Sequence, residues 1–181
     1  MNNQHKVFVS YCHTDDQHYR ERFEKLFSDV YGIIVSESVK MGGFDNTKFS
    51  TERIRQHIRD KFLRDSTVTV VLVGANTWQR KSVDWEISAS LRQTEHNTRS
   101  GLLGILLPTY SRPPGKLYDP RTIPPRLYDN IACGFSKIYA WNEERYTVHS
   151  WIHYAFKRRT EILPDNSRDP FKNNLSGEKW N

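Results

Sequence analysis

One carboxylate, Glu86, occupies the position in this chain that most favours chemistry. It follows residues 67–74, an apolar run in which β-branched side chains dominate and no charge occurs. Such a run predicts a central strand that is buried on both faces of a parallel sheet. The polar turn 75–77 separates this strand from a helix expected over residues 78–91. Because open α/β sheets bind ligands outside the carboxyl ends of their strands, Glu86 is the candidate acid of a site at that edge.

Other candidate side chains are weaker, and each has a purely structural alternative. Glu37 ends a second expected strand, where it is either a further carboxylate in the cleft or a loop cap. Asp45 lies in a glycine-rich loop and Asn76 in the turn before the helix, where both residue types also stabilise turns. Trp85 precedes Glu86, and consecutive helical side chains point about 100° apart. Packing in the core is therefore favoured for Trp85 over contact with a substrate.

Several other kinds of site are disfavoured. The adjacent pair Cys12-His13 diverges on an extended chain, so we expect Cys12 to be a small buried residue rather than a nucleophile. His149 and His153 have the spacing of zinc ligands on a helix, but the glutamate of a His-Glu-x-x-His motif is missing, and no metal site is predicted. The glycine motifs of dinucleotide-binding and P-loop proteins are absent. The central strand ends without the aspartate that a phosphoryl-accepting receiver domain needs.

The elements that must position these residues alternate between strands and helices. We expect strands at residues 7–11, 33–35, 67–74, 101–107 and 135–139. A first helix, capped by Asp15 or Asp16, carries an apolar stripe of Phe23, Leu26, Phe27 and Val30. A second helix begins at Ser50 or Thr51, and a last helix is capped by Asn142. Prolines predict that residues 108–134 are irregular. The pattern favours an α/β, flavodoxin-like domain of three layers with a mostly parallel five-stranded sheet.

Length and composition bound the remaining possibilities. The 181 residues suit one domain over residues 1–163, followed by a polar tail over 164–181 that is either disordered or lies on the surface. The chain start lacks the apolar segment of a signal peptide, and no apolar run could span a membrane. The two cysteines indicate a reducing cytoplasm. A net charge of +6 permits an anionic partner, but nucleic acid is not the expected one.

Two segments resemble TIR domains. Residues 6–11, Lys-Val-Phe-Val-Ser-Tyr, resemble the opening strand of these domains. Residues 67–86, which end in Asp84-Trp85-Glu86, resemble the central strand and catalytic helix of the TIR-like branch that includes the TIR-like subunit of the bacterial Thoeris anti-phage system. Common TIR domains carry a Trp four residues before the glutamate, whereas this chain has Ser82 there and Trp85 beside Glu86. That departure fits the TIR-like branch.

The resemblance implies an enzyme that acts on NAD. Enzymatic TIR domains cleave the bond between nicotinamide and ribose, and many cyclise the remaining ADP-ribose, so NAD is expected as substrate and no cofactor is required. Glu86 matches the family's catalytic glutamate. Phe8, Ser10 and Tyr11, with the following turn to Asp15, match positions that line the cleft.

The resemblance also implies partners. In Thoeris systems the nucleotide product activates a separate effector protein, a phage component is the expected activator, and self-association on activation is common among TIR enzymes.

A carboxylate can stabilise an oxocarbenium-like ribose electrostatically, so one glutamate can suffice for the cleavage. The alternative is a TIR-like interaction module that assembles with other proteins and catalyses nothing, since fold alone does not decide activity.

Overall fold

The computed structural model describes residues 5–29, 33–35, 50, 53, 56–58, 60, 63–94 and 98–181. The strands are β1 (His5–Ser10), β2 (Ile33–Val35), β3 (Val68–Val73), β4 (Gly101–Leu106) and β5 (Ser136–Ala140). The α-helices are α1 (Gln17–Phe27), α3 (Lys81–Ser90), α4 (Pro125–Ala132) and α5 (Arg145–Glu161), with short 3-10 turns η2 (Thr77–Gln79) and η3 (Pro120–Thr122). Helical backbone also occurs at residues 53, 56–58 and 60.

The strands pair in the order β2-β1-β3-β4-β5, and every neighbouring pair is parallel. In this register Ser10, the last residue of β1, lies beside Val71 of the central strand β3. β3 and β4 are buried along their whole length, in agreement with their mostly apolar, uncharged sequences. The expected α/β fold, a parallel sheet flanked by helices, is confirmed.

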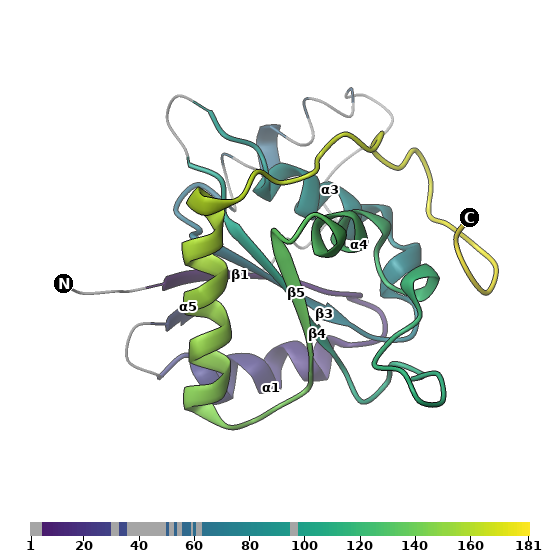
Figure 1. The fold of residues 1–181 in the computed structure, drawn as a ribbon, viewed down its shortest axis with the longest axis horizontal. Coiled ribbons are helices and arrows are strands. Elements are labelled where there is room, and N and C mark those ends of the chain that lie inside the picture. The colour runs from purple at the N-terminus through teal and green to yellow at the C-terminus, as the bar shows by residue number, and fades with distance from the viewer. Residues whose placement is uncertain are drawn as a thin grey trace.

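The two faces of the sheet are covered by different helices, and Figure 1 shows α1 and α5 on one side with α3 and α4 on the other. Alternate residues of each strand point to opposite faces. One core cluster therefore joins Val7 and Val9 of β1 to α1 and α5. A second cluster joins Val71 and Val73 of β3 to α3 and α4.

The secondary structure differs from the predictions in two segments, the one before α3 and the proline-rich stretch 108–134. The helix expected over residues 78–91 begins only at Lys81, because η2 comes first and Arg80 has an extended backbone. The stretch 108–134 was predicted to be irregular, and this was wrong because it contains η3 and the eight-residue helix α4. Pro125 opens α4 at the first helical position, where a missing N–H costs no hydrogen bond.

The residue that caps the last helix, α5, also differs from the prediction. The carboxylate of Glu144 accepts hydrogen bonds from the backbone N–H groups of Tyr146 and Thr147, so Glu144 caps α5 in place of Asn142. Tyr146 is 85% exposed, whereas Ile152 and Ala155 lie in the core. At the start of α1, Asp16 has the N-cap position but its side chain makes no cap hydrogen bond.

Residues 164–181 extend from α5 across α3 and α4, which is visible as the yellow segment in Figure 1. This agrees with the surface-bound alternative for the tail. In the described part of the chain, no helix combines the length and the apolar character needed to cross a bilayer.

Candidate active site

The side chains of Ser10 and Glu86 meet between β1 and α3. Ser10 alternates with Val7 and Val9, so it points away from their core cluster and toward α3. Its hydroxyl donates a hydrogen bond to Oε2 of Glu86 over 2.5 Å. Ser10 is 0% exposed and Glu86 is 1% exposed. The candidate acid is therefore held inside the fold at the carboxyl end of β1.

Burial decides the ionisation of Glu86. Desolvation raises its pKa to about 8, and the hydrogen bond from Ser10 acts in the opposite direction but is the smaller effect. Among the described residues, no hydrogen-bond partner reaches Oε1 of Glu86. At neutral pH the carboxyl group is accordingly protonated in the free protein, and an adjacent cation would favour its ionised form.

A polar cluster joins the loops that follow β1 and β3. Asp15 accepts hydrogen bonds from the amide of Asn76 over 2.9 Å and from the hydroxyl of Thr14 over 2.7 Å. The hydrogen bond from Asn76 is the main cause of the lowered pKa of Asp15. Arg80 donates to Thr14 and to the thiol sulfur of Cys12, which is buried as expected. Asp15 and Asn76 are thus brought together at the carboxyl edge of the sheet.

Asp16 is a buried carboxylate that sequence analysis treated only as a helix cap. It is 0% exposed, and its Oδ1 accepts a hydrogen bond from the hydroxyl of Thr109 over 2.9 Å. Burial raises its pKa. Gly74, at the end of β3, permits this position, since a Cβ atom there would lie 2.2 Å from Oδ2 of Asp16. Gly74 directly after the apolar run was the sequence feature that could have indicated a close approach.

The aromatic candidates divide between the two faces of the sheet. Phe8 and Trp85 belong to one buried cluster on the side of α3, and the indole of Trp85 donates to the carbonyl of Phe171 over 2.9 Å. Trp85 is 3% exposed, in agreement with the core assignment. Tyr11 belongs to the cluster on the opposite face and donates to Gln17. The structure therefore does not bring Tyr11 together with Glu86.

The two remaining candidates, Glu37 and Asp45, lie outside the described residues. Within the described part of the chain, no group of three His, Cys, Asp or Glu side chains could hold a metal ion.

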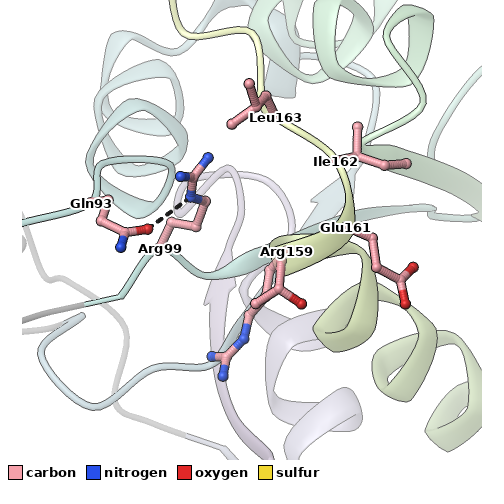
Figure 2. A pocket seen from close by; sticks show the side chains of 7 residues that line it. Gln93, Arg99, Arg159, Glu161, Ile162 and Leu163 are labelled. Carbon is pink, nitrogen blue, oxygen red and sulfur yellow. Dashed lines mark hydrogen bonds between the residues drawn. The ribbon is translucent and has the colours of Figure 1, made fainter.

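A hollow of about 220 Å³ lies away from the candidate site, near the start of β4 (Figure 2). Its walls include Gln93, Arg99 and the last residues of α5, and Arg99 donates to Gln93 over 3.1 Å. Because β1 and β4 run parallel in one sheet, this hollow lies at the opposite strand edge from Ser10. None of the residues predicted for the site line it.

Comparison with protein families identifies the family to which this fold belongs. The model for the Thoeris protein ThsB, TIR-like domain, matches residues 8–112, which is more than half of the chain. The chain belongs to this family. The resemblance inferred from residues 6–11 and 67–86 is thereby confirmed. No match was found among curated proteins.

The part of the chain that matches the ThsB TIR-like family contains the candidate site. It runs from β1 through β4 and includes Ser10, Asp15, Gly74 and Glu86. The elements that follow, α4, β5 and α5, with residues 164–181, lie beyond the matched region.

Proposed function

We propose that this ThsB-type TIR-like domain cleaves the nicotinamide–ribose bond of NAD, with Glu86 as the catalytic carboxylate. The observation that carries the proposal is the buried pair of Ser10 and Glu86 at the carboxyl end of β1. Carboxylates with a strongly raised pKa concentrate at catalytic sites. Membership of the Thoeris TIR-like family supports NAD as the substrate.

The charge of the substrate explains how a neutral Glu86 becomes active. The nicotinamide ring of NAD is cationic, so its approach lowers the pKa of the carboxyl group, which then releases its proton to solvent. The bond between ribose C1′ and the ring nitrogen breaks, and its electron pair leaves with neutral nicotinamide. The carboxylate stabilises the positive charge that develops on the ribose.

The nucleophile then determines the product. Attack at C1′ by water, which loses a proton, gives ADP-ribose; attack by a nitrogen of the adenine gives a cyclic nucleotide. Cyclisation requires water to be held away while the adenine is held close. We assign a cyclic ADP-ribose-type product that acts on a separate effector protein in bacterial anti-phage defence. A phage component as activator and self-association on activation complete the proposal, with NAD as substrate and no cofactor.

A product assay tests the proposal. Purified protein is incubated with NAD, alone and in lysate from phage-infected cells, and the nucleotides are separated by chromatography with mass detection. Glu86→Gln preserves shape but cannot ionise, and we expect it to lower NAD cleavage by about 10²-fold or more. Glu161→Gln, at the exposed end of α5, is the matched control and keeps full activity. Equal turnover in wild type and Glu86→Gln would overturn the catalytic role of Glu86. No turnover in wild type under either condition would favour the interaction-module alternative.

A further inference from the structure

We propose that Arg126 is a positioning residue for Glu86. Together with Asp84 and residues 164–181, hereafter the strap, it fixes the rotation of α3 so that Glu86 faces Ser10. The inference rests on the proposed function for the role of Glu86, but the arrangement that it describes can be measured without turnover.

The first support is a buried ion pair between α4 and α3. Arg126 donates from Nε to Oδ1 of Asp84 over 2.9 Å and from Nη2 to Oδ2 over 3.3 Å. Arg126 is 0% exposed and Asp84 is 2% exposed. A buried pair of this kind is often no more stabilising than an apolar pair of the same volume, so its distinctive contribution is directional. The planar fork of Arg126 allows Asp84 little freedom to turn.

The strap supplies further hydrogen bonds to this pair. Oδ2 of Asp84 accepts the backbone N–H of Phe171 over 3.0 Å, and Nη1 of Arg126 donates to Oδ1 of Asn166 over 2.8 Å. The amide of Asn166 then donates to the backbone carbonyl of Ser88 over 3.1 Å. A closed network thus links α4, the strap and two positions of α3.

Glu86 lies between the two positions of α3 that this network holds, Asp84 and Ser88, so the network fixes the direction of its side chain. Asp84 lies two residues before Glu86 and Ser88 lies two residues after it. Side chains two positions apart on an α-helix point in directions that differ by about 200°. Asp84 therefore points to the side of α3 opposite Glu86 and is held there by Arg126, while Ser10 holds Glu86. The intervening Trp85 is also bound to the strap at Phe171. Helix α3 is held from both sides, which restricts its rotation and so keeps Glu86 directed at Ser10.

The strap is itself anchored at several points. Asn130 of α4 exchanges two hydrogen bonds with the backbone of Asp165, over 2.7 and 3.0 Å. The side chain of Asn174 accepts the N–H of Lys81, the first residue of α3, and so supplies a helix cap from a distant part of the chain. The indole of Trp180 donates to the carbonyl of Ile123 over 2.8 Å. Figure 1 shows this segment passing over α3 and continuing beyond α4.

The test compares variants of Arg126 and Asp84 in the full chain. Arg126→Met combined with Asp84→Leu replaces the ion pair by apolar side chains and avoids leaving an unpaired buried charge. Arg126→Lys keeps the charge but cannot form the bidentate pair. The exposed bidentate pair between Arg22 and Glu143 provides the matched control, Arg22→Lys.

The primary measurement is the pKa of Glu86, obtained by carboxyl ¹³C NMR of glutamate-labelled protein and assigned by comparison with Glu86→Gln. In folded variants of Arg126 we expect this pKa to move toward its ordinary value by about one unit or more, because a rotated carboxyl group gains solvent. The second measurement is NAD cleavage, for which we expect kcat to fall by about 10²-fold with a smaller change in KM. Arg22→Lys changes neither quantity.

The outcomes separate this inference from the proposed function. If the wild type cleaves NAD but the folded double variant keeps both its kcat and the pKa of Glu86, the positioning role is wrong and the enzymatic proposal stands. If the wild type cleaves nothing but the pKa of Glu86 shifts in the double variant, the positioning role stands and the enzymatic proposal does not. Loss of kcat in the double variant without a shift in the pKa of Glu86 would also overturn the positioning role.

Discussion

The hydroxyl of Ser10 and the carboxyl of Glu86 lie 2.5 Å apart although 76 positions separate the two residues in the chain. This contact joins the carboxyl end of β1 to the middle of α3. Through this contact Ser10 donates a hydrogen bond to a carboxyl group that is only 1% exposed. The chemistry that we propose depends on this pair, and its consequences can be measured.

The rate of NAD cleavage should depend on the ionisation of Glu86. In the free protein the pKa of this group is about 8, so kcat/KM should rise about tenfold per pH unit below pH 8 and level off above it. Ser10→Ala removes the hydrogen bond that lowers this pKa, and the inflection should therefore move to higher pH. The measurement is kcat/KM for NAD between pH 6 and 10. The control Ser150→Ala, on α5, keeps the wild-type inflection. Coincident profiles for wild type and Ser10→Ala would contradict the prediction.

The stability of the protein should decrease with pH because of Glu86. Its pKa is about 8 in the folded state against 4.5 for an ordinary glutamate, so the folded state binds more protons between these values. The free energy of unfolding then falls as pH rises through this window, by up to about 1.4 kcal/mol per pH unit, and is constant above it. Glu86→Gln cannot titrate and should gain stability over wild type from pH 5 to pH 9. Urea unfolding at pH 5, 7 and 9 measures the difference; a gap independent of pH would show that burial does not raise the pKa.

The close approach of Gly74 and Asp16 predicts a strong effect of one methyl group. A Cβ atom at Gly74 would lie 2.2 Å from Oδ2 and 2.7 Å from Oδ1 of Asp16. Because Asp16 is fully buried and bonded to Thr109, it cannot move away freely. Gly74→Ala should therefore lower the free energy of unfolding by about 1–3 kcal/mol.

The same pair can be tested by a double-mutant cycle. Asp16→Ala removes the atoms that the new methyl group would meet, so Gly74→Ala should cost much less in the Asp16→Ala background. Urea unfolding of wild type, both single variants and the double variant gives the coupling energy. Strictly additive losses would show that the clash is relieved elsewhere in the structure.

His5 should make the protein sensitive to mild acid. Burial lowers its pKa to about 4, and the neighbouring His153, His149 and Arg159 add to the effect. Nε2 of His5 lies 3.2 Å from Nδ1 of His153, and its ring lies against Phe156. An unfolded histidine, with a pKa near 6.5, binds more protons than His5 does between pH 4 and 6.5. The free energy of unfolding should therefore fall as pH is lowered through this window.

Replacing His5 tests this interpretation. His5→Phe keeps an aromatic ring at the position but cannot titrate, so the loss of stability between pH 6.5 and pH 4 should be smaller than in wild type. His18→Asn, at an exposed position on α1, is the matched control and keeps the wild-type dependence. Identical acid dependence in wild type and His5→Phe would assign the effect to other groups.

Local patterns determined a large part of this fold. The runs of apolar and β-branched residues predicted the strands to within one or two residues, because strands that are buried on both faces are mostly apolar. The apolar run before Glu86 also placed this residue just after a central strand. The helix α4 was missed because its prolines, taken as breakers of structure, stand at its start, where proline is favourable.

Only the tertiary structure decided which residues meet. The resemblance to TIR domains placed Ser10, Tyr11 and Glu86 around one cleft, but alternation along β1 and the residue after it sends Tyr11 to one face and Ser10 to the other. The pair of Arg126 and Asp84 and the strap over α3 join residues that no local pattern connects. The raised pKa of Glu86 has the same origin, because desolvation is a property of all the surrounding elements together. The sequence by itself determined the family, the parallel sheet and the place of the glutamate along the chain, and packing determined its partner and its charge.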